Sequence, residues 1–289
     1  MPELPEIANL KRSLEPLLVG AVIGRVALNR PQIVRNIDQS SGTTRISGRR
    51  LLAGQTIRRL DRHGKELAII TRDGPSLCVH LGMSGQLFYW AWRRRLSRLD
   101  HVHCTWQITS PAGRGRLVFR DPRRFGGLWV FGSLSELRHS RWSRLGPDAL
   151  SVDPSTLAER LKRTRRAIKA VLLDQRVIAG IGNIYADEIL FAARIHPLST
   201  AAGLGPAQRR ALGSAIPRVL TQALRAGGST IRDYRDATGQ PGRFASRHRV
   251  YGRAGLPCHC CSRPLESIRI AQRSTVFCGS CQRRRRSDP

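Results

Sequence analysis

Residues at the two ends of the chain are of types that could do chemistry. The chain begins with MPELPE, and methionine before proline is normally removed, so we expect Pro2 to carry a free secondary amine. A terminal amine titrates at a pH of about 8, so part of it is a neutral nucleophile. Attack of this amine on the anomeric carbon of a deoxyribose would give an iminium ion, which permits elimination of phosphate. Glu3 is the adjacent carboxylate and could carry protons to the sugar ring oxygen. Prolines and acids are also common as ordinary helix caps, so the motif alone leaves both interpretations open.

The second group is a set of cysteines near the other end. Cys258, Cys261, Cys278 and Cys281 form two Cys-x2-Cys pairs with a 16-residue spacer. Four thiolates in this spacing can enclose one Zn²⁺ in a tetrahedron and leave no open position for catalysis. We therefore expect a single structural zinc, contributing on the order of 10 kcal/mol to folding of a short zinc ribbon. Cys260 lies between two of the ligands and could compete with Cys261.

The composition points to a partner rich in phosphate. The 289 residues include 50 Lys and Arg against 20 Asp and Glu, a net charge of +30. The hydrophobic content of 40% is enough for real cores and excludes a disordered basic tail. A charge excess of this size favours nucleic acid as the partner. Only four residues are lysine; arginine grips phosphate bidentately, although a GC-rich genome would also favour it.

Further features of the sequence indicate the cellular compartment of the protein. The seven cysteines are an odd number and four have metal spacing, which indicates a reducing compartment. No apolar run reaches the roughly 18 residues of a membrane span. The acidic start does not resemble a signal peptide. We expect a cytoplasmic, nucleoid-associated monomer with no membrane partner.

The pattern along the chain changes three times. Apolar residues at helical spacing predict a helix over 3–18. Short apolar runs between 21 and 131, such as 66–70 and 128–131, predict strands of a sandwich or barrel. Helical periodicity returns from 154 to about 226, and 227–247 is a loop rich in Gly, Arg and Ser.

Four short motifs and the cysteine segment together resemble a known family. The motifs are PELPE at 2–6, HLGMSG at 80–85, DPRRFG at 121–126 and GIGNIYA at 180–186. In this order they closely resemble the formamidopyrimidine-DNA glycosylases, bacterial repair enzymes that excise 8-oxoguanine and ring-opened purines. The resemblance covers nearly the whole chain and implies damaged double-stranded DNA as the partner.

The resemblance implies roles for the matching residues. Pro2 is similar to the Schiff-base nucleophile, Glu3 to its acid/base partner, and Lys65 to a hairpin lysine that contacts phosphate near the lesion. Residues that resemble those filling the gap left by a flipped nucleotide are Met83, Arg123 and Phe125. Without the family, Lys65 would be interpreted as a solvated charge, and Met83 and Phe125 as core residues. Residues that resemble contacts to the DNA backbone are His80, Arg124, Lys169, Asn183 and Arg273.

The implied fold is α+β. An N-terminal helix would pack on a two-layer β-sandwich, followed by a helical helix–two-turn–helix domain and a C-terminal zinc ribbon. The expected boundaries are 1–131 for the catalytic sandwich, 132–153 for a linker, 154–247 for the helical domain with a lesion-capping loop, 248–283 for the zinc finger and 284–289 for a basic tail.

The implied reaction is base excision followed by strand cleavage through β- and then δ-elimination. One alternative is an endonuclease VIII-like enzyme that prefers oxidised pyrimidines, against which Leu4 and Phe125 argue. The other is a DNA-binding module without catalysis, against which Pro2, Glu3 and Lys65 argue. Departures from the family pattern leave lesion preference open; they are Ala170, Arg194, the basic stretch 93–98 and the Arg-rich loop 235–247.

Overall fold

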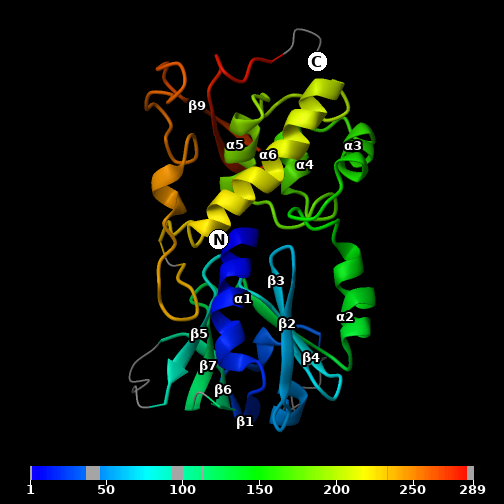
Figure 1. Ribbon diagram of the computed structural model, residues 1–289, viewed down its shortest axis with the longest axis vertical. Coiled ribbons are helices and arrows are strands. Elements are labelled where there is room, and N and C mark those ends of the chain that lie inside the picture. The colour runs from blue at the N-terminus through cyan, green and yellow to red at the C-terminus, as the bar shows by residue number, and fades with distance from the viewer. Residues whose placement is uncertain (1, 37–45, 93–99, 112, 233, 285–289) are drawn as a thin grey trace. The chain divides into compact units, whose positions relative to one another are not determined.

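The computed structural model describes residues 2–36, 46–92, 100–111, 113–232 and 234–284. The basic stretch 93–98 and most of the basic tail, 285–289, therefore lie outside the described residues. The chain forms two compact units (Figure 1). The first unit combines residues up to 143 with 227–242, and the second combines 144–226 with the residues from 243 onward.

The first unit is a helix packed on two four-stranded antiparallel sheets (Figure 1). Its helix α1 spans Leu4–Leu18, with Pro5 in the first turn where proline is tolerated. One sheet has the order β1-β6-β7-β5, with strands Val22–Leu28 (β1), Gln86–Ala91 (β5), Val102–Ser110 (β6) and Gly113–Arg120 (β7). The other has the order β2-β3-β4-β8, with strands Ile57–His63 (β2), Glu66–Thr71 (β3), Ser76–His80 (β4) and Gly127–Phe131 (β8). The predicted α+β fold with a helix on a two-layer sandwich is confirmed.

One apolar core joins this helix to both sheets. Leu10 and Leu14 of α1 are buried in the same cluster as Leu67 of β3 and Trp106 of β6. The Trp106 indole donates to the Leu51 carbonyl at 3.0 Å, so the one polar atom of this ring is satisfied. A fully buried leucine contributes about 1.5–3 kcal/mol, so α1 is fixed firmly by its apolar face.

The segment expected to be a linker is largely structured. Residues 132–143 belong to the first unit and contain helix α2 (Leu134–Ser140), whose Ser133 side chain accepts from the Glu136 amide. Directly after α2, Arg141 and Trp142 bind the carboxylate of Glu66 on β3. This attachment to a strand is the reason that 132–143 is not a free connection.

The second unit is helical with a two-stranded hairpin. Its elements are Pro154–Lys162 (α3), Ile168–Leu173 (α4), Asn183–Ala192 (α5), Pro206–Arg225 (α6), Glu266–Ile270 (β9) and Arg273–Phe277 (β10). Single 3₁₀ turns occur in the two units at Pro31–Ile33, Gly48–Leu51, Trp142–Arg144 and Phe244–Arg247. Helix α3 begins with proline, and its N-cap Asp153 accepts two backbone amides, a strong start signal.

The loop 227–242 belongs to the first unit, although we expected it to belong to the helical domain. Ala237 is buried in the sandwich core, its amide donates to Ser13 of α1, and its carbonyl accepts from the Tyr89 amide of β5. These contacts link residues more than 140 positions apart. The loop therefore completes the sandwich although its sequence follows the four helices α3 to α6 of the second unit.

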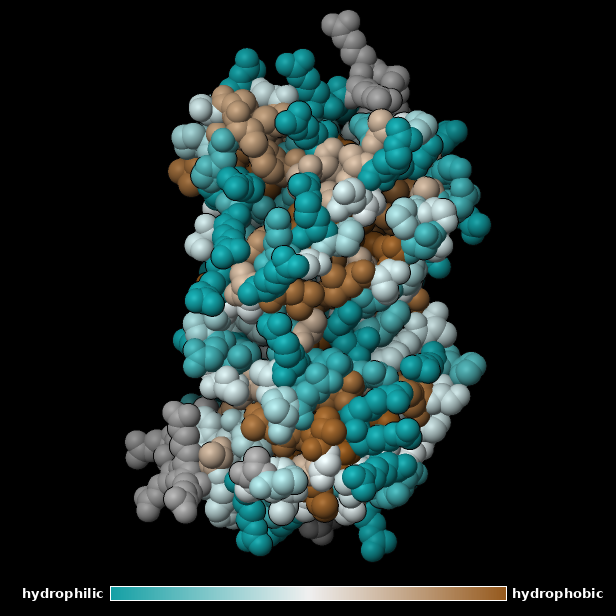
Figure 2. All heavy atoms as spheres, in the orientation of Figure 1, coloured by the Kyte–Doolittle hydropathy of each residue, from teal (hydrophilic) through white to brown (hydrophobic). Residues whose placement is uncertain are grey.

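Polar side chains dominate the visible surface. Figure 2 shows hydrophilic residues over much of this face, with apolar residues between them, as the net charge of +30 leads one to expect. No helix among the described residues is long and apolar enough to cross a membrane.

Candidate active site and nucleic-acid contacts

The first candidate residues lie at the start of α1. Pro2 and Glu3 are both buried, and Glu3 is only 1% exposed. The Glu3 amide donates to the Glu6 carboxylate at 2.8 Å, a capping interaction that fixes the backbone beside Pro2. The helix dipole favours negative charge here, so two carboxylates can be kept beside the candidate nucleophile.

Glu6 also fastens the loop 227–242. Its second carboxylate oxygen accepts from the Ser229 amide at 2.7 Å, and its carbonyl accepts from the Tyr234 hydroxyl at 2.9 Å. Gly228 has a φ of +84°, and a Cβ at this position would lie 2.7 Å from the Glu6 carboxylate. Only glycine therefore permits this close approach, which brings the loop against the helix that carries Pro2 and Glu3.

Lys65 lies in the two-residue turn between β2 and β3. Gly64 precedes it with a φ of +54°, the conformation that a tight hairpin turn requires. Lys65 is 8% exposed, so it is not the solvated surface charge that the family-independent interpretation would give. A tight hairpin turn holds the lysine in one position, which suits a side chain that is expected to contact one particular phosphate of the DNA.

His80 lies at the end of β4 and pairs with Glu66 of the neighbouring strand β3. Burial lowers the pKa of His80, and its Nδ1 accepts from the Gly82 amide at 3.0 Å. The imidazole is thus neutral at pH 7 with its proton on Nε2. That N–H is a suitable donor to a phosphate oxygen.

The residues resembling gap fillers lie on two loops that pack together. Gly82, in the loop that carries Met83, has a φ of +60°, and a Cβ there would lie 2.4 Å from the Phe125 backbone. The loop of Phe125 is therefore pressed against the loop of Met83, and the structure brings both of these candidates together with Arg123.

Phe125 and Arg123 are exposed. Phe125 is 55% exposed, and the Arg123 guanidinium lies over its ring at 4.9 Å. The exposure excludes the alternative that Phe125 is a core residue and fits a side chain that enters a base stack.

Asp121 organises the second of these loops. It is completely buried, accepts from the Ser84 hydroxyl at 2.6 Å and from the Gly126 amide at 2.7 Å. Ser84 in turn accepts from the Arg123 amide, and Arg124, with a φ of +59°, donates to the Asp121 carbonyl. One carboxylate thus connects both loops. The sequence motifs contained Asp121 and Ser84, but we gave neither a role.

Two candidates of the second unit lie near the hairpin β9–β10. Asn183 is the first residue of α5, and its amide nitrogen donates to the Ser274 carbonyl at 3.0 Å. Arg273 is exposed at the start of β10, after a turn in which Ala271 and Gln272 both have positive φ. The side-chain amide of asparagine has a second N–H, so Asn183 can still donate to a phosphate.

Lys169 differs from our expectation. We expected a phosphate contact, but the side chain is 0% exposed and its ammonium group lies 2.7 Å from Asp187 Oδ1. It also donates to the Ser274 carbonyl and to the Thr275 hydroxyl. A buried ammonium with three protein acceptors is already satisfied, so Lys169 joins α4 and α5 to the hairpin instead of contacting DNA.

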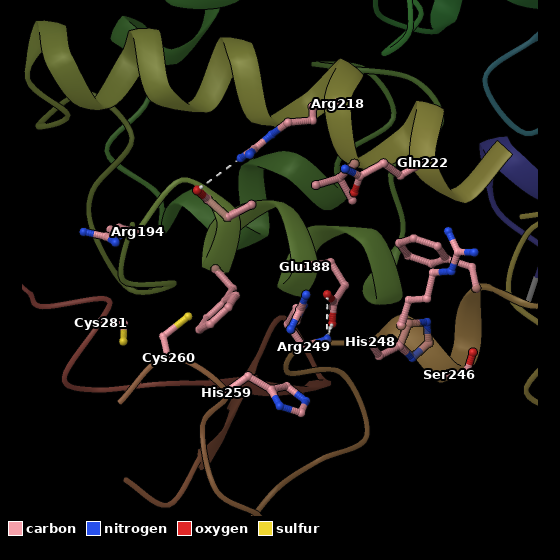
Figure 3. A pocket seen from close by; sticks show the side chains of 15 residues that line it. Glu188, Arg194, Arg218, Gln222, Ser246, His248, Arg249, His259, Cys260 and Cys281 are labelled. Atoms are coloured by element: carbon pink, nitrogen blue, oxygen red, sulfur yellow. Dashed lines mark hydrogen bonds between the residues drawn. The ribbon is translucent and has the colours of Figure 1, made fainter. Parts of the chain in front are cut away.

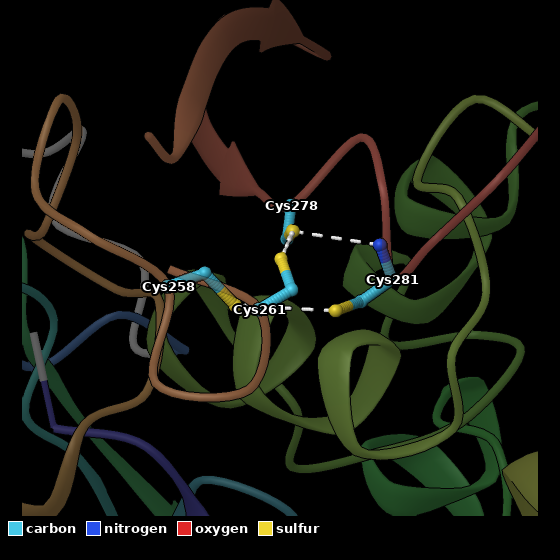
Figure 4. Close-up of side chains that lie close together, drawn as sticks. All are labelled: Cys258, Cys261, Cys278 and Cys281. Carbon is cyan, nitrogen blue, oxygen red and sulfur yellow. Dashed lines mark hydrogen bonds between the residues drawn. The ribbon is translucent and has the colours of Figure 1, made fainter. Parts of the chain in front are cut away.

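Figure 4 shows the four predicted cysteine ligands converging. Their sulfur atoms all lie within 4.8 Å of one another, with Cys261 to Cys278 at 3.5 Å and Cys258 to Cys281 at 4.0 Å. A zinc tetrahedron with bonds of about 2.3 Å has edges of roughly 3.7 Å, so the donor set fits one structural zinc. The competing ligand Cys260 is exposed and stands outside this cluster.

Two clusters of polar residues had no signal in the sequence. Glu66 accepts from Arg141 at 2.6 and 2.9 Å and from the Trp142 indole at 3.1 Å, next to Lys65. Glu188 of α5 accepts from the backbone amides of 249–251. Both carboxylates find partners far along the chain, which spacing alone does not reveal.

Three family models match successive segments of the chain. The formamidopyrimidine-DNA glycosylase N-terminal domain matches residues 1–128, and the H2TH domain of the same glycosylase matches 145–235. A zinc finger found in FPG and IleRS matches 255–284.

Comparison with whole proteins extends over almost the full chain. Formamidopyrimidine-DNA glycosylase of Chloroflexus aurantiacus is 42% identical over 288 residues, covering 98% of both chains. That of Solibacter usitatus is 39% identical, covering 98% of this chain and all of its own.

Solved structures agree. The crystal structure of MutM (Fpg) from Thermus thermophilus matches with a TM-score of 0.83 and 39% identity, covering 97% of this chain and 98% of that one. A complex of Lactococcus lactis Fpg with DNA containing an abasic site matches with a TM-score of 0.85 and 31% identity, covering 98% of this chain and 100% of that one. The chain therefore belongs to the formamidopyrimidine-DNA glycosylase family.

Proposed function

We propose that this chain is a bifunctional DNA glycosylase and abasic-site lyase that removes oxidised purines, such as 8-oxoguanine and formamidopyrimidines, from double-stranded DNA. The observation that carries the proposal is the buried pair Pro2–Glu3 at the start of α1 in a chain that belongs to this family throughout its length. Catalysis requires removal of Met1, since only then is the Pro2 nitrogen a secondary amine.

The first step would be attack of the Pro2 nitrogen on C1′ of the damaged nucleotide. The C1′–N bond to the base breaks, and the base leaves with a proton. Glu3 then protonates the sugar ring oxygen, so that the ring opens and a C1′ iminium ion forms on Pro2.

The iminium ion would make strand cleavage possible. It withdraws electrons from C2′, so loss of a C2′ proton expels the 3′ phosphate, and a further elimination expels the 5′ phosphate. Water finally releases the sugar fragment from Pro2. The product is a one-nucleotide gap with a phosphate at each end.

The two packed loops would hold the distorted duplex. Flipping a nucleotide costs a few kcal/mol of lost stacking, and apolar wedges can offset it. The exposed ring of Phe125, with Met83, is suited to this, and Arg123 can hydrogen-bond the unpaired base. The backbone contacts we propose are Lys65, His80, Arg124, Asn183 and Arg273.

Zinc held by the four cysteines would fold the hairpin that presents Arg273. The metal is structural and takes no part in the reaction, because all four ligands come from the protein. The DNA substrate favours cytoplasmic, nucleoid-associated residence, and we propose that the protein acts as a monomer.

Borohydride trapping tests the mechanism. A duplex containing 8-oxoguanine opposite cytosine is incubated with the protein and borohydride, and the cross-linked peptide is identified by mass spectrometry. We expect a reduced adduct on Pro2. An adduct on a lysine instead, or no adduct with a duplex that is bound, would refute Pro2 as the nucleophile.

The control is a chain with Gly-Ser inserted between Met1 and Pro2, which converts the Pro2 nitrogen to an amide. It should bind the duplex and give no Pro2 adduct. A parallel duplex with thymine glycol tests the endonuclease VIII-like alternative, and faster excision from that duplex would overturn the choice of oxidised purines.

A further inference from the structure

A pocket in the second unit has no role in the proposed reaction. Its volume is about 800 Å³, and it lies between α5, α6, the segment 244–249 and the loop around Cys260 (Figure 3). Phe191, Val219 and Phe244 provide buried apolar surface. The volume is within the range of about 300–1,000 Å³ that is usual for ligand sites.

Arginines surround this pocket. Arg194, Arg218, Arg247 and Arg249 line it, and all four are exposed. In Figure 3, Arg218 projects from α6 at the top, Arg194 lies at the left and Arg249 lies below them. Their charges are spread around the rim, so a ligand that matches them must carry several separated negative groups.

Acidic side chains of the pocket itself do not neutralise the four arginines at its rim. Among the described residues that line the pocket, Glu188 is the sole acid. It is 4% exposed, and its two oxygens accept the backbone amides of Arg249, Val250 and Tyr251 at 2.9–3.0 Å. These consecutive amides could otherwise bind a phosphate, but Glu188 already fills that place.

Arg194 occupies its position at a conformational cost. It follows the C-cap of α5 with a φ of +56°, where glycine is usual. A side chain in this region costs on the order of 1 kcal/mol. A guanidinium placed at a pocket in spite of backbone strain suggests a function for that charge.

From these observations we infer that the pocket is a docking site for an acidic segment of a partner protein, with several carboxylates around one large apolar side chain. Guanidinium groups bind carboxylates in a bidentate manner, and the apolar surface accepts the anchoring side chain. The four arginines are separated from one another and surround apolar residues, and the backbone amides of 249–251 already bind Glu188. Both features favour an acidic peptide over a single phosphate group.

Within the second unit, the docking site uses a different part of α5 from the proposed DNA contact Asn183. Asn183 is the first residue of α5, whereas the pocket uses residues from Glu188 to Arg194 at the other end of that helix. A helix of 10 residues is about 15 Å long, so the pocket residues of α5 lie toward the end opposite Asn183. The inference uses none of the residues to which the proposed reaction assigns a role.

Fluorescence anisotropy with a labelled peptide tests the inference. The probe is a ten-residue peptide of Asp and Glu with one central Phe, titrated with the full-length zinc-loaded protein. We expect saturable binding that weakens at least tenfold in the double variant Arg194→Gly/Arg218→Ala. Glycine suits a positive φ, so this variant should fold at least as well at residue 194.

The matched control is Arg210→Ala, which removes another exposed arginine of α6 that does not line the pocket. It should bind the peptide like wild type, and a peptide with Ser in place of Phe should bind at least tenfold more weakly. Equal binding by wild type and the double variant, or equal loss in R210A, would overturn the docking site. Displacement of the peptide by inorganic phosphate or by single-stranded oligothymidine at lower concentration than by unlabelled peptide would also overturn it.

Discussion

Lys169 and Asp187 form a completely buried ion pair, with 2.7 Å between the ammonium nitrogen and Oδ1. Burial raises the pKa of Asp187 to about 6, although Lys169 acts to lower it. Asp187 also accepts from the Val276 amide of β10 at 3.1 Å, so the pair fastens the zinc hairpin to α4 and α5.

Removing one partner of this pair should be strongly destabilising. Lys169→Met leaves a buried carboxylate without its cation and should lower the free energy of unfolding of the second unit by about 3–5 kcal/mol. The double variant Lys169→Met/Asp187→Asn keeps an acceptor for Val276 and should recover more than half of this loss. Chemical denaturation followed by circular dichroism measures both. A loss in K169M below 1 kcal/mol would contradict the structural role of Lys169.

Phe125→Ala should reduce excision activity while leaving the stability of the fold almost unchanged. The side chain is 55% exposed, so its removal should change the free energy of unfolding by no more than about 0.5 kcal/mol. Excision of 8-oxoguanine should fall at least tenfold, because the ring would no longer replace lost stacking. Phe119→Ala, a completely buried control in β7, should instead cost about 3–5 kcal/mol. Unchanged excision by F125A would remove Phe125 from the site.

Asp121→Asn should loosen the two loops that carry the proposed gap fillers. The amide cannot accept as strongly from both Ser84 and Gly126, and a hydrogen bond to a charged group contributes about 1.5–3 kcal/mol. We expect kcat/KM for lesion excision to fall at least tenfold while binding to undamaged duplex is retained. Asp73→Asn, in an exposed turn, is the control and should behave like wild type. Parallel losses in both variants would count against positioning by Asp121.

Cys278→Ser should remove the zinc and with it the affinity for lesion DNA. A hairpin without its metal cannot present Arg273, whereas the sandwich has its own core. Metal content by mass spectrometry and a gel-shift titration measure the two effects. Cys260→Ser is the matched control, since Cys260 is exposed and outside the cluster, and should keep one zinc and normal affinity. Normal DNA affinity in the zinc-free C278S protein would refute this role of the finger.

Asp174 should give the second unit a defined dependence on pH. Hydrogen bonds from Arg176, and further ones from Arg166, lower the pKa of Asp174 to about 2. The carboxylate therefore stabilises the fold above its usual pKa of about 3.9, and this contribution is lost as the pH falls through about 2. Asp174→Asn should be less stable than wild type by about 1 kcal/mol at pH 7, after allowance for solvent screening. Denaturation of both proteins at pH 7 and pH 2.5 should show the difference shrinking, and a constant difference would contradict the assignment.

Local sequence signals predicted the elements whose formation depends on nearby residues. The cysteine spacing predicted the metal cluster, and the apolar run at 66–70 predicted β3. Both signals are local, because ligand spacing and apolar runs can be recognised from neighbouring residues alone. The family motifs predicted a shared role for the two loops, and the structure packs these loops together. The motifs could not show that Phe125 is exposed, since exposure depends on how the loops fold back on Gly82.

Long-range contacts explain what the sequence did not reveal. Lys169 was interpreted as a phosphate contact because nothing near it in sequence showed that Asp187 would neutralise it. The loop 227–242 was assigned to the helical domain that precedes it, but Glu6 binds its Ser229 amide across 223 positions. Partners at such separation are fixed by tertiary packing, which no local pattern encodes.

The discontinuous first unit has a consequence for synthesis of the protein. Residue 143 leaves the ribosome well before the loop 227–242, and at about 5–20 residues per second the delay is roughly 5–20 s. During this time the Glu6 carboxylate lacks the Ser229 amide, and the site of Ala237 in the sandwich core is open. The N-terminal half of the chain therefore finishes folding only after the helices of the other unit have been made, the reverse of the usual N-to-C order.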